Sequence, residues 1–274
     1  MNNKILIFGK GFIGNRLQEE LSSPCSTARL KTSQDIQHEI DRYKPQMIIN
    51  CIGQTGKNNV DDCEKVVDQT LEANTFIPLL MAEVALRNHI KLVHVSSGCI
   101  YHYDYTKSRP ISEEKIPDYY DLYYSRTKIY ADSALRELAK RYDILIIRIR
   151  IPLDDRPHPK NLLTKLINYK TIIDVPNSTT YIPDFIRALK YLLHQKAKGT
   201  YNVVAKGALV YSKLLDVYQK YRPDFEYKII SLKDLKLVRT NLILSTRKLE
   251  KLGFPIRHST EILEECVKNY IKYL

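Results

Sequence analysis

The stretch Lys4-Ile-Leu-Ile-Phe8 runs straight into Gly9-Lys-Gly11-Phe-Ile-Gly14 and then Asn15-Arg-Leu-Gln-Glu-Glu-Leu21. The first segment is a short apolar run, which is typical of a strand buried on both faces of a parallel sheet. The last segment has the spacing of an amphipathic helix. Strand, glycine turn and helix therefore occur in the order that a βαβ unit requires.

The same alternation continues through the first half of the chain. We expect buried strands at 47–52, 92–96 and 144–148, separated by helices around 33–44, 62–88 and 123–141. Strands that alternate with helices in this way form a doubly wound parallel sheet, so the sequence predicts an α/β fold.

Beyond residue 150 the pattern becomes irregular, because prolines interrupt it at 152, 157, 159, 176 and 183. A helix is expected at 182–193 and a strand at 199–204. We predict a nucleotide-binding domain over residues 1–150, with its sheet completed by about 171–204. Residues 151–170 and 205–274 are expected to form a smaller substrate-binding region.

Composition narrows the class of protein. A chain of 274 residues can bury a full core, and its five scattered cysteines fit neither a disulfide framework nor a zinc site. The seven histidines are isolated, so we expect no metal. No segment approaches the roughly 20 apolar residues of a membrane span, and no cleavable leader is evident. A cytoplasmic protein without a membrane partner is expected.

The net charge of +12 raises the question of nucleic acid. The lysines and arginines are spread along the chain without a tract of five or six, which argues against nucleic-acid binding. Two readings remain: a solvated basic surface, or electrostatic steering of an anionic small molecule such as a nucleotide diphosphate.

The spacing Gly9-x-Gly11-x-x-Gly14 after a strand favours a dinucleotide site over a merely structural turn. The acidic residue that would hold the adenosine ribose is missing, since that region reads Ser26-Thr-Ala-Arg29-Leu-Lys31. Together with Lys10, Arg29 favours NADPH, while NADH stays open. Gly53 ends the third expected strand. It either lets the backbone pass close to the cofactor or forms a simple turn between the strand and the next loop. Further cofactor contacts are expected at Phe12, Ile13, Gln54, Thr55, Asn74 and Ile151.

Tyr124 and Lys128 lie four residues apart, on one face of the expected helix. The Lys128 ammonium could lower the pKa of the Tyr124 phenol and make it a working acid. A solvated helix face would show the same spacing. The segment Ser97-Gly98-Cys99-Ile100-Tyr101 adds a hydroxyl and a thiol just after a core strand. The set suggests proton chemistry beside a ketone.

The glycine turn, Ser97 and Tyr124-x-x-x-Lys128 together resemble the extended short-chain dehydrogenase/reductase superfamily. Within it the chain is most similar to the bifunctional 3,5-epimerase/4-reductases of UDP-rhamnose synthesis and to the dTDP-4-dehydrorhamnose reductases. The resemblance covers nearly the whole chain and rests on residues 55–64, 97–101, 124–128, 148–152, 161–165 and 175–180. Asn58, Asp62 and a glycine loop one residue shorter depart from the family pattern.

This resemblance implies a Rossmann-type sheet and the conversion of a nucleotide-4-keto-6-deoxyglucose to nucleotide-L-rhamnose. By this resemblance, Tyr124 is the acid that protonates the C4 oxygen of the sugar. Lys128 lowers the pKa of Tyr124 and contacts the nicotinamide ribose, and Ser97 holds the sugar carbonyl in place. Cys99 and Lys165 correspond to the pair implicated in epimerisation. Substrate contacts are expected at Ser97, Gly98, Arg150, Asn161 and Arg239. A homodimer built on helices 62–88 and 123–141, acting after a separate 4,6-dehydratase, is also implied.

The chemistry is coherent, because a 4-ketone acidifies the protons on C3 and C5, and a thiol and a desolvated lysine suit their exchange. Cys99 as an inert small side chain and Lys165 as an exposed helix residue are the plain alternatives. GDP-fucose synthase is a competing interpretation. That enzyme pairs its cysteine with a histidine in the region that corresponds to residues 163–165 here. This chain has no histidine at those positions, and His158 is the nearest one in the sequence. A reductase without epimerase activity and a non-enzymatic dinucleotide-binding regulatory subunit also remain open.

Overall fold

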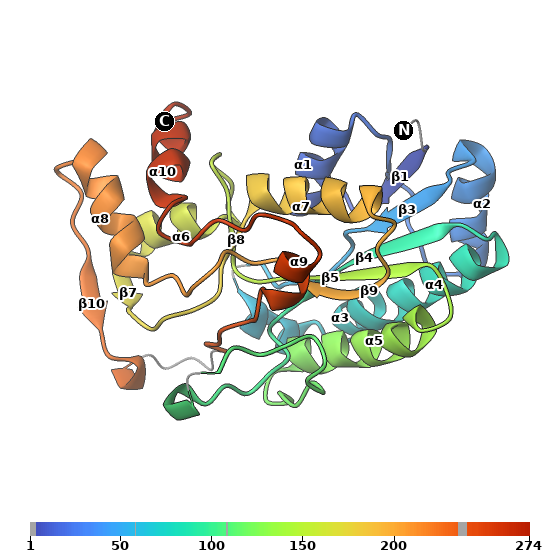
Figure 1. Cartoon of the computed structure of the whole chain (residues 1–274), viewed down its shortest axis with the longest axis horizontal. Helices are drawn as coiled ribbons and strands as arrows, with labels where there is room; N and C mark the ends of the chain where they lie inside the picture. Colours follow the sequence, from blue (N-terminus) through green and yellow to red (C-terminus); the bar gives the residue numbers. More distant parts are fainter. Residues whose placement is uncertain (1–3, 58, 108, 235–239) are drawn as a thin grey trace. The chain divides into compact units, whose positions relative to one another are not determined.

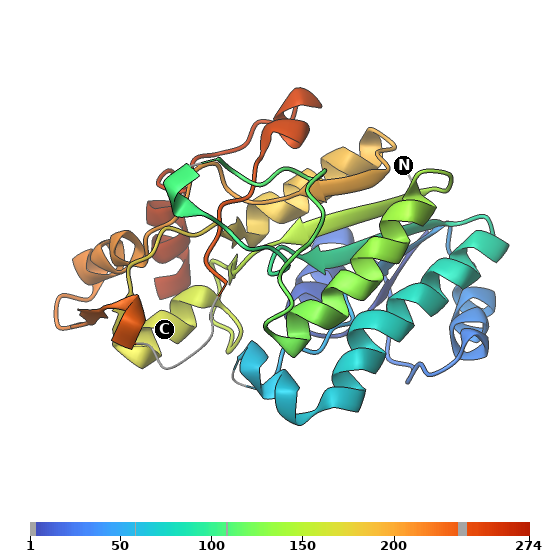
Figure 2. The ribbon, with the colours of Figure 1, turned by 90° about the horizontal axis from the view of Figure 1, so that it is seen from below.

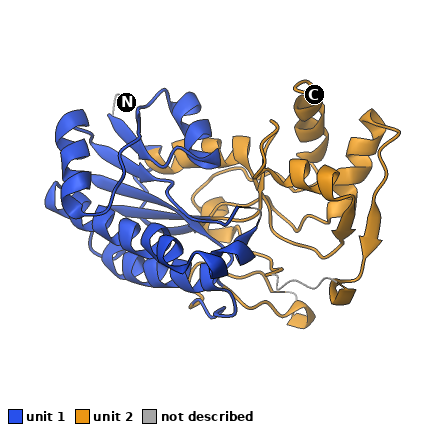
Figure 3. Cartoon of the chain, turned by 180° about the vertical axis from the view of Figure 1, so that it is seen from behind, with its two compact units in different colours: residues 1–100, 117–148, 194–201 blue, residues 101–116, 149–193, 202–274 orange. Residues whose placement is uncertain are grey.

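The computed structural model describes residues 4–57, 59–107, 109–234 and 240–274. The chain divides into two compact units, shown in blue and orange in Figure 3. The first unit comprises residues 1–100, 117–148 and 194–201, and the second comprises residues 101–116, 149–193 and 202–274. The chain therefore crosses from one unit to the other several times.

The central sheet has six strands in the order β2-β1-β3-β4-β5-β9. Strand β1 pairs in parallel with β2 and β3, and β3 pairs in parallel with β4. The strands are β1 (Ile5–Phe8), β2 (Cys25–Ser26), β3 (Met47–Asn50), β4 (Lys91–Ser97), β5 (Ile144–Ile149) and β9 (Gly199–Asn202). This order confirms the predicted doubly wound α/β fold.

Strand order also locates the place where a ligand binds in such a sheet. After β1 the chain adds β2 on one side and then β3 on the other, so the topology switches direction at β1. Ligands of open parallel sheets bind outside the carboxyl ends of the strands at such a switch. The glycine turn leaves β1 at that end of the sheet.

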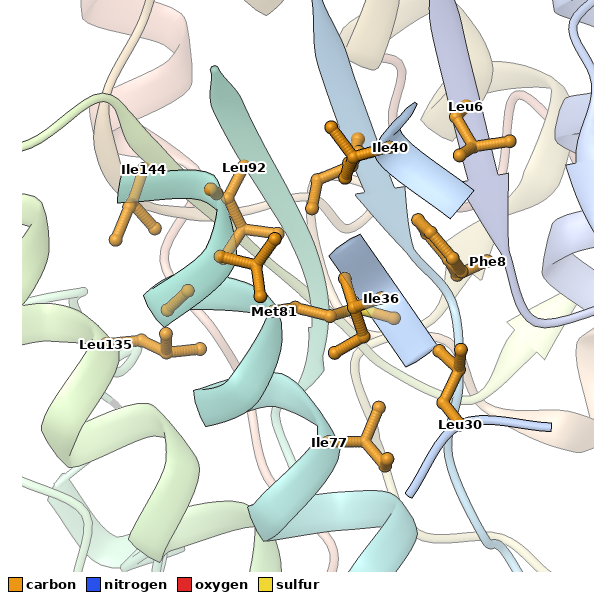
Figure 4. Packing of buried hydrophobic residues seen from close by; sticks show 14 of the residues in the cluster. Leu6, Phe8, Leu30, Ile36, Ile40, Ile77, Met81, Leu92, Leu135 and Ile144 are labelled. Atoms are coloured by element: carbon orange, nitrogen blue, oxygen red, sulfur yellow. The ribbon is translucent and has the colours of Figure 1, made fainter. Parts of the chain in front are cut away.

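The helices of the first unit form two layers on the sheet (Figures 1 and 2). They are α1 (Phe12–Leu21), α2 (Ser33–Tyr43), α3 (Val67–Leu71), α4 (Ile77–Arg87) and α5 (Tyr123–Ala139). One hydrophobic cluster joins α2, α4 and α5 to the sheet; Figure 4 shows Ile36 and Ile40 of α2, Met81 of α4 and Leu135 of α5. Helix α1 lies on the opposite face.

Strand β1 shows why both faces must be covered. Leu6, Ile7 and Phe8 are all buried, and successive side chains of a strand point to opposite faces. Leu6 and Phe8 belong to the cluster with α2, α4 and α5, so Ile7 points to the other face. The continuous apolar run is thus explained by a sheet covered on both sides.

One predicted helix is wrong in detail. Residues 62–88 form four consecutive segments: the 3-10 turn η1 (Val60–Lys65), α3, the π-helical turn η2 (Glu72–Phe76) and α4. The break between η1 and α3 falls at Val66, whose φ of −131° and ψ of 57° lie outside the helical region. Hydrophobic spacing alone does not mark such a break, because the apolar residues Val66 and Val67 stand at it.

The second unit contains two small parallel pairs, β6 with β8 and β10 with β7. Its elements are η3 (Tyr105–Lys107), β6 (Pro152–Leu153), α6 (Leu162–Tyr169), β7 (Thr171–Ile173), β8 (Thr180–Tyr181), α7 (Ile182–His194), α8 (Tyr211–Tyr221), β10 (Lys228–Ile230), η4 (Leu232–Asp234), α9 (Arg247–Lys251) and α10 (Leu263–Ile271). Leu163, Leu214 and Val267 bring α6, α8 and α10 into one core. Among the described helices, none has the length and apolar character needed to cross a bilayer.

Candidate cofactor and catalytic site

The glycine turn between β1 and α1 has the close contacts of a phosphate loop. Gly9 has a φ of 100°, and a Cβ on it would lie 2.6 Å from the backbone nitrogen of Ile52. A Cβ on Gly14 would lie 1.9 Å from the carbonyl oxygen of Gly9. Both positions therefore require glycine.

Gly11 differs from the other two glycines. A Cβ built on it would meet no described atom within 4 Å, so open space lies above this residue. Helix α1 begins at the next residue, and the positive end of its dipole therefore points toward that space. An open cradle at a helix N-terminus fits the pyrophosphate of a dinucleotide, with Phe12 and Ile13 in the first helical turn.

Two cations flank the end of β2. Lys10 and Arg29 are exposed, and the charge of Lys10 reaches the Cys25 thiol, whose pKa is raised by burial and lowered by that lysine. The hydroxyl of Ser26 donates to the buried Glu39 carboxylate at 2.6 Å, so one oxygen of this carboxylate already accepts a hydrogen bond. The arrangement is compatible with a phosphate on the adenosine ribose.

Ser97 and Cys99 stand at the carboxyl end of β4. Ser97 is the last residue of the strand, and its Oγ accepts a hydrogen bond from the Cys99 backbone N–H at 3.1 Å. The hydroxyl oxygen accepts this hydrogen bond, and the hydroxyl proton is left to donate to the carbonyl of a ligand. Cys99 is half-buried, whereas Gly98 between the two residues is buried.

Tyr124 and Lys128 lie in the first two turns of α5 and are only 6% and 4% exposed. They do not form a solvated helix face. A Cβ on Gly53 would lie 3.1 Å from the Lys128 Nζ and 3.3 Å from the Asn74 Oδ1. A side chain at position 53 would have no room, because the Lys128 ammonium and the Asn74 amide fill that space.

The Lys128 ammonium is the strongly perturbed cation of this site. Burial lowers its pKa to about 8, while the nearby thiols of Cys63, Cys99 and Cys51 act in the opposite direction. Lysine in water has a pKa near 10.4, so the protein bears a free-energy cost to keep this cation. Tyr124 stands one helical turn before Lys128 on α5.

Asn74, expected as a cofactor contact, is fully buried on η2. Its Oδ1 accepts from the Gln54 backbone N–H at 2.9 Å, and its Nδ2 donates to the Gln54 carbonyl at 3.0 Å. The Gln54 side-chain Oε1 accepts from the Thr55 backbone N–H at 3.2 Å. Asn74 thus fixes the backbone that follows Gly53.

The remaining expected residues lie in the second unit. Lys165 is half-buried on α6, and Asn161 begins that helix with its side chain bonded to backbone groups of Asp154, Arg156 and Leu163. The buried Arg150 guanidinium donates to the Asn177 side chain and to the Thr240 carbonyl. Their substrate contacts, and the pairing of Lys165 with Cys99, stay predictions. Ile151 has a φ of 36°, which is rare for a β-branched residue. Arg239 and Asn58 lie outside the described residues.

Two thiols were missed by reasoning from the sequence. Cys63 is fully buried and Cys51 follows β3, and both act electrostatically on Lys128. The position of Cys51 directly after a core strand was a usable signal. Cys63 had none, because its approach to Lys128 depends on how η1 packs. Within the described part of the chain, no group of three or more metal-ligating side chains is found.

The family model described as RmlD substrate binding domain matches residues 3–214. A curated relative in Arabidopsis thaliana, named bifunctional dTDP-4-dehydrorhamnose 3,5-epimerase/dTDP-4-dehydrorhamnose reductase, is 30% identical over 269 residues, which cover 91% of this chain and 87% of the relative. A trifunctional relative from the same plant, which also carries a UDP-glucose 4,6-dehydratase in its name, is 29% identical. The chain spans only 39% of its length.

Among solved structures, the UDP-rhamnose synthase of Acanthamoeba polyphaga mimivirus matches with a TM-score of 0.89 and 25% identity, covering 98% of this chain and all of that one. A dTDP-4-dehydrorhamnose reductase from Bacillus anthracis, in complex with NADP, has a TM-score of 0.83 at 20% identity and covers both chains fully. The latter match shows a shared Rossmann-type fold. The two plant relatives are named for both epimerisation and reduction of a nucleotide sugar, and the Bacillus anthracis enzyme is named for reduction alone.

Proposed function

This chain belongs to the family of RmlD substrate-binding domains, and we propose that it converts a nucleotide-4-keto-6-deoxyglucose to nucleotide-L-rhamnose by 3,5-epimerisation and NADPH-dependent 4-keto reduction. One observation carries the proposal. Ser97, Cys99 and Lys128 are linked to one another through the Ser97–Cys99 hydrogen bond and the Cys99–Lys128 electrostatic contact. The glycine turn lies in the same unit.

We assign the cofactor to the first unit. Gly9, Gly11 and Gly14 would hold its pyrophosphate, and Lys10 and Arg29 would face a 2′-phosphate, which favours NADPH over NADH. Bound NADPH supplies the hydride for C4 of the sugar. NADP and NADPH are also present in the structures of the Bacillus anthracis and Pseudomonas aeruginosa neighbours.

The reduction requires a proton for the C4 oxygen. Tyr124 would donate this proton from its phenol, and the buried Lys128 cation would stabilise the phenolate that remains. The Ser97 hydroxyl would donate a hydrogen bond to the same oxygen as negative charge develops on it. Tyr124, Lys128 and Ser97 all belong to the first unit, and Ser97 ends strand β4.

Epimerisation requires proton exchange at C3 and C5 beside the ketone. We assign one acid–base group to Cys99, whose half-buried thiol lies near the Lys128 cation. Lys165, on α6 of the second unit, would act as the other acid–base group. Arg150, Asn161 and Arg239 would bind the sugar. The A. thaliana relatives carry both activities in their names.

The substrate is proposed to be UDP-linked, as the name of the mimivirus structure favours, while the bifunctional A. thaliana relative is named for dTDP sugars. A 4-keto-6-deoxy sugar has to be made by a 4,6-dehydratase. The trifunctional relatives carry that activity in the same polypeptide. We propose that such a dehydratase acts before this chain.

The test is incubation with NADPH and UDP- or dTDP-4-keto-6-deoxyglucose in deuterated water. We expect NADPH oxidation and a rhamnose product that carries deuterium at C3 and C5. Lack of NADPH oxidation with either substrate would contradict the reductase, and a product without deuterium at C3 and C5 would contradict the epimerase. Cys99→Ala should lose the exchange and retain reduction of a pre-epimerised substrate.

The same experiment separates the competing readings. A plain dTDP-4-dehydrorhamnose reductase would reduce pre-epimerised sugar without incorporating deuterium. A GDP-fucose synthase would need a histidine as the partner of Cys99. His158 is the nearest candidate by sequence, but its Nδ1 accepts from the Lys160 backbone N–H at 3.0 Å, and burial lowers its pKa. A regulatory subunit would bind NADPH without turnover.

We also propose a homodimer that uses α3, η2 and α5. Val67, Phe76 and Tyr130 on these mutually contacting segments are 44%, 52% and 47% exposed, and large apolar side chains exposed together can mark an interaction surface. Pairing with the same helices of a second copy would cover them and give a closed, two-fold symmetric assembly.

A further inference from the structure

The Thr127 side chain lies inside the Tyr124-x-x-x-Lys128 turn and is fully buried. Its hydroxyl donates to the Tyr124 carbonyl at 2.8 Å and accepts from the Asn74 Nδ2 at 3.2 Å. Its carbonyl accepts from the Thr75 hydroxyl at 2.8 Å. Two of these hydrogen bonds thus join the turn that carries the acid to η2, and the third ties Thr127 to the Tyr124 carbonyl within that turn.

The π-helical turn explains how neighbouring residues of η2 both reach α5. In η2 the Ile77 N–H bonds to the Glu72 carbonyl, which closes a wider turn than that of an α-helix. Asn74 and Thr75 are consecutive residues, yet they are 0% and 5% exposed and both contact Thr127. Such turns are rare and occur frequently at functional sites.

Asn74 extends this connection to the cofactor side of the sheet. The amide that contacts Thr127 also binds the backbone N–H and carbonyl of Gln54. Gln54 follows Gly53, the residue whose missing side chain leaves room for the Lys128 ammonium. A closed path of contacts therefore runs from the Tyr124 carbonyl through Thr127 and Asn74 to Gln54 and Gly53, and so to the Lys128 ammonium.

We propose that Thr127 is a positioning residue, which fixes the distance between the Lys128 ammonium and the Tyr124 phenol through its contacts with Asn74 and Thr75. This inference rests on the proposed function in that Tyr124 acts as the acid. Coulombic stabilisation of a phenolate falls with distance and is strong only in a water-poor site. A loosened turn would let Lys128 move away, and the pKa of Tyr124 would rise.

The test compares Thr127→Val, which removes the hydroxyl while nearly keeping the shape, with Thr127→Ser, which retains it. Ser125→Ala is the matched control, because Ser125 is fully buried in the same turn and no described residue bonds to its hydroxyl. Two readouts are the pKa of Tyr124, followed by 13C NMR of labelled tyrosine and assigned with Tyr124→Phe, and the pH profile of kcat.

Thr127→Val should raise the pKa of Tyr124 by about one pH unit and shift the alkaline limb of kcat upward with it. It should lower kcat by about tenfold, which lies within the roughly hundredfold loss that a misplacement of about 1 Å can cause. Thr127→Ser and Ser125→Ala should match the parent protein in both readouts. If Thr127→Val does not fold, Thr75→Val tests the second connection to the same turn and should act in the same direction.

The outcomes distinguish this inference from the proposed function. If the parent protein oxidises no NADPH with either sugar, the proposed reductase is wrong, while the NMR comparison of Tyr124 still decides whether Thr127 positions the turn. A lower melting temperature with an unchanged pKa of Tyr124 would show a purely structural role and overturn the inference. So would equal effects of Thr127→Val and Ser125→Ala.

Discussion

Two buried lysines of the first unit should respond in opposite ways to the same substitution. Lys128 is 4% exposed, and among the described residues no carboxylate forms an ion pair with it. Lys91 is 8% exposed, but its ammonium pairs with Asp143 and donates to the Ala197 carbonyl at 2.8 Å. Replacing each by methionine separates the cost of a desolvated charge from the benefit of a paired one.

The magnitude follows from the pKa of Lys128. Burial lowers it from 10.5 to about 8 in the folded protein, so below pH 8 both states are protonated and folding bears the full cost of burying the charge. At roughly 1.4 kcal/mol per pH unit, this cost is about 3 kcal/mol. Lys128→Met should therefore raise the free energy of unfolding at pH 7 by about 2–3 kcal/mol while abolishing reduction.

The pH dependence has a definite sign. Between pH 8 and 10.5 the unfolded chain binds the lysine proton and the folded protein does not, so the stability of the parent protein rises relative to Lys128→Met as pH increases. The advantage of the variant should shrink over this range. Urea unfolding at pH 7, 8, 9 and 10 measures it.

Lys91→Met serves as the control, because it leaves the Asp143 carboxylate and the Ala197 carbonyl without their shared donor. We expect it to lose about 1–3 kcal/mol at every pH in this range. The reasoning would be refuted if Lys128→Met destabilised the protein at pH 7, or if its stability difference from the parent were the same at pH 7 and pH 10.

Three further predictions concern the glycine turn, the proposed dimer and a buried ion pair. Gly11→Ala should fold normally but weaken NADPH binding in a fluorescence titration. Gly14→Ala should lower the free energy of unfolding by about 2 kcal/mol or more, because its Cβ would meet a backbone oxygen at 1.9 Å. Equal melting temperatures for the two variants would contradict this prediction. Phe76→Glu should convert the proposed dimer to monomer in sedimentation equilibrium, with an unchanged mass as the contrary result. Arg148→Met should cost about 3–5 kcal/mol, because it leaves the fully buried Asp132 carboxylate without its partner at 2.6 Å; adding Asp132→Leu should restore most of the stability.

Much of the first unit could be predicted because its signals are local. The apolar run at 4–8, the glycine spacing and the Tyr124–Lys128 interval each arise within a few residues, and the structure places them on β1, on the turn into α1 and on α5. Parallel strands buried on both faces also leave continuous apolar runs, which are easy to recognise. The predicted helices 33–44 and 123–141 end within two residues of α2 and α5.

The rest depends on contacts between distant segments. Nothing in the sequence around Glu72–Phe76 marks a π-helical turn, because its widened geometry is held by Asn74 and Thr75 bonding to residues more than 50 positions away. Gly53 was predicted as a cofactor contact or a simple turn. Its closeness to the Lys128 Nζ depends on how α5 packs on the sheet, which the local sequence does not show.

His94 is a second buried group whose pKa is lowered by burial, and unlike Lys128 it is neutral in the folded protein at pH 7. It is fully buried on β4, and its Nδ1 lies 3.2 Å from the Asn50 Nδ2. The Asn50 Oδ1 already accepts from the Ile52 backbone N–H, so Nδ2 is the donor and His94 carries its proton on Nε2. No described residue bonds to that Nε2. Burial, aided by the Lys128 charge, lowers the pKa of His94 to about 3.

This pKa predicts part of the acid sensitivity of the protein. Between pH 6.5 and about 3 the unfolded chain binds a proton on His94 that the folded protein does not, so stability falls as pH decreases, by roughly 1.4 kcal/mol per pH unit. His94→Asn keeps an acceptor near the Nδ1 position and removes the titration. Its stability should therefore depend less steeply on pH between 6 and 4, whatever its absolute value at pH 7. His38→Asn, at a side chain 79% exposed, is the control and should keep the parent slope. Equal slopes for the parent protein and His94→Asn in urea unfolding at pH 4, 5 and 6 would mean that His94 is protonated within the fold, and that the Asn50 amide does not hold it neutral.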